Sequence, residues 1–208
     1  MRPLVVTMFT SLDGVVQAPG GPDEDTSGGF RYGGWLVPHV DEALGAQIDA
    51  WFEPASAFLL GRGTYEIFAG SWPQVPVEDP VSKALNGLPK HVASRTLRGP
   101  LGWAGSTLLG DDVPAAVRQL KADGDGELQV HGSPGLVQTL LAEDLVDELR
   151  LVVAPVVLAG GKRLFGAGAR PGGWRPATSR TTPAGVVLTT YTRAGEVETG
   201  AIGPEYDS

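Results

Sequence analysis

The sequence predicts an α/β fold in which a central, mixed and mostly parallel β-sheet is flanked by helices and ends in an antiparallel hairpin. Short apolar segments rich in β-branched residues alternate with segments whose apolar residues recur at helical spacing. Strands that alternate with helices in this way form parallel sheets. Near the C-terminus, Trp174–Arg180 and Val186–Arg193 flank the turn TPAG, which is typical of a hairpin. An antiparallel pair at the edge makes the predicted sheet mixed.

The composition favours one globular domain. The chain has 208 residues, of which 42% are apolar, and this is enough to bury one sizeable core. We expect a single domain at 1–195 and an acidic, flexible tail at 196–208. The formal net charge is -8 and the basic residues are scattered, which argues against a nucleic-acid partner.

The sequence contains no pattern typical of secretion or membrane insertion. The apolar run at the N-terminus meets Asp13-Gly14 too early for a signal peptide, and no later run is long enough to span a membrane. The chain has no cysteine, so disulfides and thiolate ligands are excluded. We therefore expect a soluble, cytoplasmic protein with no membrane partner.

The predicted strands are short and apolar. The first is apolar along almost its whole length, as expected of a central strand covered on both faces. Pro155 follows the last parallel strand and predicts that pairing is interrupted there. Before the hairpin, the expected strands are Leu4–Thr10, Ala57–Leu60, Lys90–Ala93, Ser106–Leu109, Glu127–His131 and Leu149–Ala154.

The predicted helices have recognisable starts. Val40–Trp51 carries Asp41 and Glu42 in its first turn, where acidic side chains favour the helix dipole. Asp111 or Asp112 can cap a later helix. Two further helices are expected directly after the glycine-containing segments GRGT, which starts at position 61, and GSPG, which starts at position 132.

A glycine-rich segment separates the first strand from the first helix. Gln17 to Trp35 is dense in glycine and includes a few aromatic residues, so we expect a long mobile loop. Loops of this length in compact domains often act as lids over a site. A tolerated surface insertion is the alternative.

The segment Gly132-Ser133-Pro134-Gly135 joins a predicted strand directly to a helix. A helix N-terminus presents unpaired N–H groups and attracts phosphate, and glycine lets a ligand approach the backbone. Ser133 can cap this helix, and Pro134 suits its first position. The segment therefore predicts an anion-binding site, with a well-capped helix as the alternative.

A second junction, Gly61-Arg62-Gly63-Thr64, adds a guanidinium and a hydroxyl to another helix start. A cation at a helix N-terminus opposes the local dipole, and an anion shared between the two explains its presence. Two such sites suit a dinucleotide with separated phosphates. Ser94-Arg95 follows a third short strand and can serve the nucleoside end, or it can be an exposed polar turn.

Four motifs in order resemble those of a known family. GRGTYE from Gly61, ASRTL from Ala93 and SLDG from Ser11 resemble motifs of dihydrofolate reductases and of the reductase domain of riboflavin biosynthesis. LVDELRLVVAPVVLAGGKRLF resembles the riboflavin branch, the C-terminal domain of the bacterial deaminase-reductase. The resemblance runs from Leu4 to Arg193. It implies a three-layer dihydrofolate reductase-like fold and an NADPH-dependent reductase.

The resemblance also implies roles for individual residues. The GRGT segment would hold the 2′-phosphate and pyrophosphate region, Ser94-Arg95 the adenosine end, and the GSPG segment the pyrophosphate. The chain from Met8 to Ser11 would line the nicotinamide and substrate cleft. The candidate NADPH-binding residues are therefore Met8, Gly61, Arg62, Thr64, Ser94, Arg95, Gly132, Ser133, Pro134 and Gly135.

Acidic residues at two places in the chain are candidates for the catalytic proton. Dihydrofolate reductases use a buried acid on the helix behind the glycine-rich segment, and Asp41 or Glu42 lies in the corresponding region. Asp13 is a second candidate in the cleft. Helix capping by Asp41 and turn formation by Asp13 are the alternatives. We assign no metal, because His39, His91 and His131 are too far apart in sequence for a local motif.

The expected reaction is hydride transfer from NADPH to a C=N or C=O bond of a small heterocyclic substrate, pterin-like or pyrimidine-like, or of a carbonyl compound. A non-catalytic nucleotide-binding or assembly protein is one alternative, and an enzyme that uses another nucleotide is a second. A homodimer through Leu149–Leu158 is implied by the resemblance, while a buried position in the sheet explains this apolar segment equally well.

Overall fold

The structure, a computed structural model, describes residues 1–166 and 169–202 and is built around one β-sheet. Within these residues the sheet has eight strands in the order β4-β3-β2-β5-β1-β6-β8-β7. β1 to β6 run parallel, and β8 pairs antiparallel with β6 and β7. The strands are β1 (Leu4–Ser11), β2 (Ala55–Gly61), β3 (Lys90–Ala93), β4 (Ser106–Leu108), β5 (Glu127–Val130), β6 (Glu148–Ala154), β7 (Gly173–Thr181) and β8 (Val187–Gly195).

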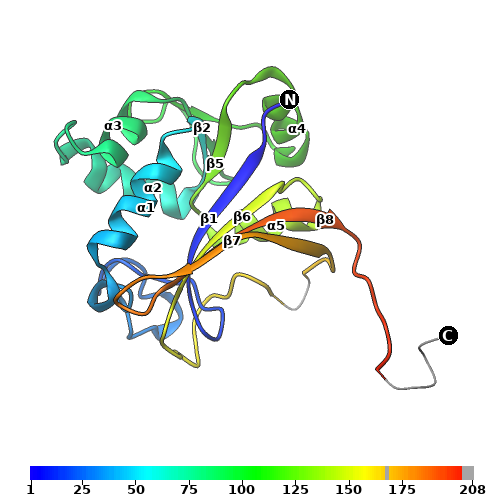
Figure 1. Cartoon of the computed structure of the whole chain (residues 1–208). Coiled ribbons are helices and arrows are strands. Elements are labelled where there is room, and N and C mark those ends of the chain that lie inside the picture. Colours follow the sequence, from blue (N-terminus) through cyan, green and yellow to red (C-terminus); the bar gives the residue numbers. More distant parts are fainter. Residues whose placement is uncertain (167–168, 203–208) are drawn as a thin grey trace.

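Helices cover both faces of this sheet, which makes three layers (Figure 1). One face packs against α4 and α5, and the other packs against α1, α2 and α3. Among the described residues, no helix is long and apolar enough to cross a membrane. The helices are α1 (Glu42–Phe52), α2 (Arg62–Ser71), α3 (Pro80–Gly87), α4 (Val113–Asp123) and α5 (Pro134–Ala142), with short 3-10 turns at Ser27–Gly29, Val37–His39 and Trp72–Gln74.

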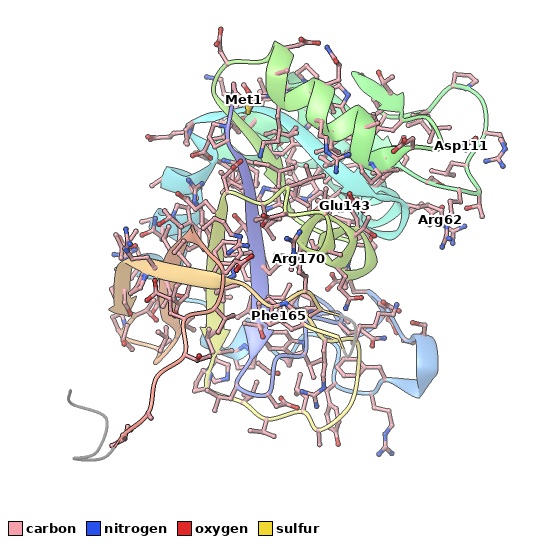
Figure 2. The ribbon with its side chains drawn as sticks, turned by 90° about the vertical axis from the view of Figure 1, so that its right-hand side faces the viewer. Met1, Arg62, Asp111, Glu143, Phe165 and Arg170 are labelled. Atoms are coloured by element: carbon pink, nitrogen blue, oxygen red, sulfur yellow. The ribbon has the colours of Figure 1, made fainter. Side chains whose placement is uncertain are left out.

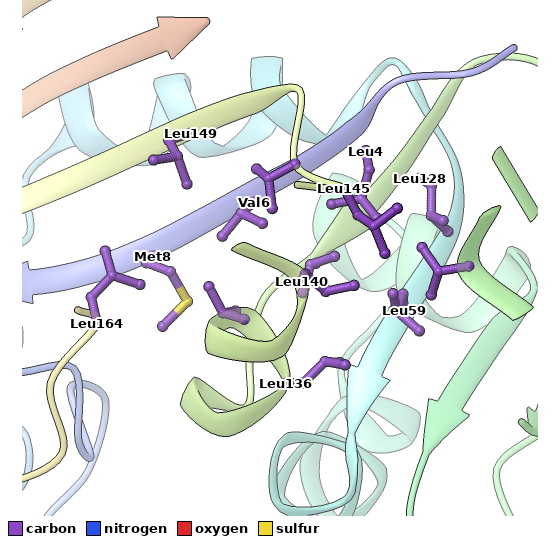
Figure 3. Packing of buried hydrophobic residues seen from close by; sticks show 14 of the residues in the cluster. Leu4, Val6, Met8, Leu59, Leu128, Leu136, Leu140, Leu145, Leu149 and Leu164 are labelled. Carbon is purple, nitrogen blue, oxygen red and sulfur yellow. The ribbon is translucent and has the colours of Figure 1, made fainter. Parts of the chain in front are cut away.

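β1 is buried on both faces because it lies in the middle of the sheet. Alternate side chains point to opposite faces, so Leu4, Val6 and Met8 share one core with Leu136 and Leu140 of α5 (Figure 3). Fully burying each such side chain contributes about 1.5–3 kcal/mol. The almost continuous apolar run at the start of the sequence is thus explained by a central parallel strand.

The predicted fold class is confirmed, and the expected strands and helices are present with small shifts at their ends. Two helix caps are the expected aspartates: Asp41 accepts from Leu44 N (2.8 Å), and Asp112, rather than Asp111, accepts from Ala115 N (3.0 Å). α3 has no counterpart among the predicted helices. The last six residues of the predicted tail, 203–208, lie outside the described residues.

Leu149–Leu158 begins in the interior of the sheet. β6 lies between β1 and β8, and Leu149, Val152 and Ala154 are buried in the core. This arrangement accounts for the apolar strand by burial within one chain. A homodimer stays a prediction.

A buried ion pair joins β5, β6 and α1. Arg150 of β6 donates from Nη2 to Glu127 Oε1 (2.6 Å) and from Nη1 to Glu127 Oε2 (3.0 Å). Its Nη1 also reaches the Trp51 carbonyl (3.0 Å), and its Nε donates to Glu148 Oε1 (2.6 Å). These hydrogen bonds satisfy a charged side chain that is only 6% exposed, as a buried charge requires.

We expect Arg150→Leu to lower the free energy of unfolding by about 3–5 kcal/mol, because it leaves the Glu127 carboxylate buried without its cation. Urea denaturation measures this loss. Arg118→Leu is the matched control, since the Arg118–Glu143 pair is exposed and its removal should change stability by at most about 1 kcal/mol. Equal losses in the two variants would contradict the structural role of the buried pair.

Candidate functional site

Two helix N-termini meet at one edge of the sheet. β2 and β5 are parallel neighbours, with Leu59 paired to Val130, so their carboxyl ends lie together. β2 leads directly into α2, and β5 leads into α5 after a short turn. Gly61 N donates to the Gly132 carbonyl (3.0 Å), which joins the two junctions. The structure thus brings together the two predicted anion-binding sites.

Ser133 links the two junctions instead of capping its own helix. It occupies the N-cap position of α5 without a side-chain cap bond. Its Oγ instead accepts from Thr64 N (3.1 Å) and lies 3.3 Å from Thr64 Oγ1. The expectation that Ser133 caps α5 is therefore wrong, because the first turn of α2 lies close enough to use its hydroxyl.

The glycines at the two junctions have different roles. A β-carbon on Gly61 would lie 2.6 Å from Ser133 Oγ, and one on Gly132, whose φ is +125°, would lie 2.5 Å from Thr64 Oγ1. These two glycines are needed for the junctions to pack together. Among the described parts of the chain, a β-carbon on Gly135 would meet no atom within 4 Å. The space over the first turn of α5 is therefore open to a ligand.

Arg62 connects α2 to the loop after β3. Its Nη1 donates to Thr96 Oγ1 (2.8 Å), and its Nε lies 3.6 Å from Glu66 Oε2. The side chain is about half exposed (51%) and lies at the periphery of the molecule (Figure 2). Ser94 Oγ accepts from Thr96 N (3.1 Å) and Leu97 N (2.9 Å), so it shapes this loop. The predicted Arg62 and Ser94-Arg95 sites therefore lie on adjoining segments.

A cavity of about 820 Å³ adjoins the two junctions. Its walls are mostly apolar and include Phe9, Ile48, Phe52, Phe68 and Trp72. Of the candidate cofactor residues, the cavity is lined by Met8, Thr64, Gly132, Ser133 and Pro134, and its lining does not include Gly61, Arg62, Ser94, Arg95 or Gly135. The candidates thus divide into a set that lines the cavity and a set that does not.

The glycine-rich segment forms one wall of this cavity. Residues 20–25 line it, and Gln17 at their base is buried. Gln17 Nε2 donates to the carbonyls of Asp25 and Ser27 (2.9 Å each), while Trp35 Nε1 donates to the Gln17 carbonyl (2.8 Å). The segment is therefore part of the site and not a peripheral insertion. Opening and closing as a lid stays a prediction.

Two polar side chains of the sheet face the cavity, and the sequence reading assigned neither to the substrate cleft. Thr7 of β1 and His131, directly after β5, line the cavity, and we call them the sheet-side polar pair. Burial and the nearby Arg150 guanidinium lower the pKa of His131 to about 3, so its ring is neutral at physiological pH. In the sequence, Gln129 and His131 alternate with apolar residues, so both polar side chains point to the same face of a buried strand. This pattern was the signal that could have identified His131.

Asp13 lies in a turn outside the lining of the cavity. Its carboxylate accepts from Ser11 Oγ (2.7 Å), Leu158 N (3.0 Å) and Ala159 N (3.0 Å), and Arg163 Nη2 lies 3.2 Å away. The hydrogen bond from Ser11, with those from the backbone, lowers the pKa of Asp13 to about 2. These contacts fit the turn-forming alternative better than proton donation.

Asp41 is also outside the lining of the cavity and caps α1. Besides Leu44 N, its carboxylate accepts from Ala184 N (2.8 Å) in the turn between β7 and β8. These backbone hydrogen bonds lower the pKa of Asp41. The contacts of Asp41 are therefore those of a helix cap, which was the alternative to a catalytic role. Among the described residues, no three His, Asp or Glu side chains are grouped to hold a metal ion.

Comparisons with known proteins agree with this architecture. YyaP, an uncharacterised protein of Bacillus subtilis, is 25% identical over 195 residues, which cover 91% of this chain and 94% of YyaP. The structure of a putative riboflavin biosynthesis protein from Shewanella has a TM-score of 0.67 at 24% identity and covers 93% of this chain and 99% of the other.

The dihydrofolate reductase-like fold is confirmed at lower sequence identity. Dihydrofolate reductase from Enterococcus faecalis, in a complex with NADP(H), has a TM-score of 0.58 at 11% identity, and the match covers 92% of this chain and 96% of that one. The family model of the RibD C-terminal domain matches residues 2–188. This match spans both helix junctions and the cavity between them, and the chain belongs to the RibD C-terminal domain family.

Proposed function

We propose that this chain is an NADPH-dependent reductase that transfers hydride to a C=N or C=O bond of a small heterocyclic substrate, pterin-like or pyrimidine-like, or of a carbonyl compound. One observation carries the proposal: the N-termini of α2 and α5 meet beside an apolar cavity of about 820 Å³. Ligands of open α/β sheets bind at the carboxyl ends of the strands, and helix N-termini bind phosphate. The family supports a reductase.

The open first turn of α5 fits the pyrophosphate of NADPH. Pro134 has no N–H to lose, and Ser133 leaves the first-turn N–H groups uncapped. Gly135 keeps the space over them free of side-chain atoms. A dinucleotide needs this kind of close backbone approach, because phosphate oxygens accept directly from main-chain N–H groups. NADPH, when bound, supplies the hydride.

The loop after β3 fits the adenosine end. Arg62 and Arg95 lie on adjoining segments there, and Arg62 is already held toward Thr96 by a hydrogen bond. Guanidinium groups bind phosphate through paired charge-assisted hydrogen bonds. These two residues would therefore hold the 2′-phosphate. Thr64, whose N–H donates to Ser133 Oγ, would lie at the pyrophosphate, and Met8, which lines the cavity, would lie at the nicotinamide.

The cavity would orient the acceptor and exclude water. Phe52, Phe68 and Trp72 give it apolar walls, and the 20–25 segment closes one side. An apolar, enclosed site strengthens the electrostatic interactions inside it and protects a reactive hydride donor. The proton that completes the reduction would come from water, because Asp13 and Asp41 are committed to backbone hydrogen bonds that favour their ionised forms.

Thermal-shift titrations with NADPH and NADH side by side test the cofactor. Binding to the native state alone should add about 2.7 kcal/mol of stability at a hundredfold excess over the dissociation constant. NADPH oxidation with pterin, pyrimidine and carbonyl acceptors then tests turnover. Binding without oxidation by any acceptor would favour the non-catalytic nucleotide-binding or assembly protein. A cytoplasmic location and a homodimer stay predictions.

We expect Arg62→Ala to weaken NADPH binding about tenfold to a hundredfold, which corresponds to the loss of one charge-assisted contact of about 1.5–3 kcal/mol. NADH binding should change little, since NADH lacks the 2′-phosphate. Fluorescence titration of both cofactors measures the ratio, and Arg118→Ala, on α4 and outside the lining of the cavity, is the control. An equal loss for both cofactors would refute the proposed role.

Gly135→Leu should weaken both cofactors alike, by about tenfold or more, because the side chain fills the space where main-chain N–H groups meet phosphate. The fold should tolerate the change, since leucine is a better helix former than glycine and a β-carbon at position 135 meets no protein atom. Gly45→Leu, at an open position of α1, is the matched control for calorimetry and titration. Unchanged affinity in the Gly135 variant would place the pyrophosphate elsewhere.

The pH dependence of stability distinguishes a structural Asp13 from a catalytic one. Because folding lowers its pKa to about 2, the ionised Asp13 stabilises the fold above the unfolded pKa of about 3.9. This contribution disappears as pH falls from about 4 through about 2. We expect Asp13→Asn to be less stable than the wild type at pH 7 and to approach it below about pH 3, with NADPH turnover retained. Lost turnover at unchanged stability would instead identify Asp13 as the proton donor.

A further inference from the structure

The sheet-side polar pair is not used by the cofactor or by the proton source proposed above. In the parallel pairing of β1 with β5, Val6 is opposite Val130. Thr7 follows Val6 and His131 follows Val130, so Thr7 and His131 occupy adjacent positions on one face of the sheet. Both line the cavity. On the sheet side of the cavity, a substrate would therefore meet these two polar side chains.

Thr7 carries a hydroxyl that has no hydrogen-bond partner among the residues that the structure describes. The residue is 2% exposed, and Thr7 Oγ1 is a buried oxygen with no hydrogen bond. Buried polar atoms in native proteins are nearly always hydrogen-bonded, and an exception calls for an explanation, such as a catalytic role or a water or ion that binds there. Valine would fill the same space without this penalty. Among the described residues, the buried hydroxyls of Ser106, Thr182 and Thr189 also lack a partner, but only Thr7 lines the cavity. A hydrogen-bonding group that enters the cavity would satisfy it.

The tautomer of His131 follows from a chain of hydrogen bonds that begins at Arg150. Arg150 holds Glu127, and Gln129 Nε2 donates to Glu127 Oε2 (2.7 Å) and to the Trp51 carbonyl (2.5 Å). Both amide hydrogens are thereby used, so Gln129 Oε1 is the atom that lies 3.2 Å from His131 Nε2. An amide oxygen can only accept, and the proton of the neutral ring therefore lies on Nε2.

This assignment leaves Nδ1 of His131 as an acceptor. The ring stacks on Phe52 with centroids 4.7 Å apart and an angle of 21° between the planes, and it is tilted against Phe58 at 5.8 Å. Aromatic contacts on these sides hold the ring in one orientation, and the residue keeps some exposed surface next to the cavity. Apolar neighbours also disfavour a positive charge on the ring.

We propose that Thr7 Oγ1 and His131 Nδ1 form the hydrogen-bonding pair that determines which acceptor ring fits the cavity, and that Gln129 is a positioning residue that sets the His131 tautomer. His131 Nδ1 takes an uncharged donor such as a ring N–H, and the Thr7 hydroxyl donates to an acceptor next to it. The proposal rests on the proposed function only in that the ligand is the substrate of the same cavity.

Nitrogen NMR of the protein labelled with ¹⁵N-histidine tests the tautomer directly. We expect the His131 ring to carry its proton on Nε2, and Gln129→Met to give a mixture of both tautomers while His39 and His91 keep their signals. If Gln129→Met disrupts the fold, the ring nitrogen resonances of all three histidines will shift. The wild-type spectrum alone then decides the tautomer of His131. A wild-type ring protonated on Nδ1 would overturn the proposal.

Titration with 2-pyridone, a neutral ring with an N–H next to a C=O group, tests the pair. The His131 Nδ1 resonance should move with 2-pyridone and not with N-methyl-2-pyridone, which lacks the donor hydrogen. Thr7→Val should weaken 2-pyridone binding about fivefold to tenfold, the loss of one hydrogen bond, without lowering the melting temperature. Thr7→Ser should restore binding.

Equal responses of His131 to the two pyridones, or full affinity in Thr7→Val, would overturn the proposal. Neither measurement needs NADPH or turnover. If the proposed reductase activity is not found, the pyridone result can still be interpreted. If the pyridone test fails, the NADPH titrations are unaffected.

Discussion

The parallel pairing of β2 with β5 is the constraint on which the rest of the site depends. Since both strands end at the same edge, α2 and α5 must begin side by side, and Gly61 and Gly132 allow their first turns to touch. Ser133 then bonds to Thr64 across the junction. The open backbone at Gly135, the cavity behind it and the reach of Arg62 toward the next strand all follow from this one contact between helix starts.

A second constraint comes from the charged group behind the cavity. Arg150 and Glu127 are far apart in sequence, yet they form a bidentate pair that also reaches α1 through the Trp51 carbonyl. Replacing a whole buried pair with apolar residues often leaves stability unchanged, whereas removing one partner is strongly destabilising. Here the pair orients Gln129, which contacts His131 at the cavity. The free energy of unfolding and the orientation of the His131 ring thus depend on the same few hydrogen bonds.

The sequence predicts the alternation of strands and helices, the hairpin and the two glycine junctions, because each of these features has a local signal. α3 also had one, Asp79-Pro80 before an apolar periodic segment, and was overlooked. The partner of Ser133 could not be predicted locally, because it depends on which strands are neighbours. Thr7 and His131 were missed as cavity residues for the same reason: a threonine and a histidine in apolar strands gain meaning only when pairing places them together.

The anchoring of the glycine-rich segment has a consequence for how this family can diversify. Gln17 and Trp35 fasten its two ends to each other through their own hydrogen bonds, so the 20–25 tip contributes a cavity wall without being part of the sheet. Insertions or replacements at the tip would alter the shape of the acceptor pocket and leave the helix starts intact. Changes in the shape of the cavity can therefore be confined to this one segment, while the junctions of β2 with α2 and of β5 with α5 stay the same.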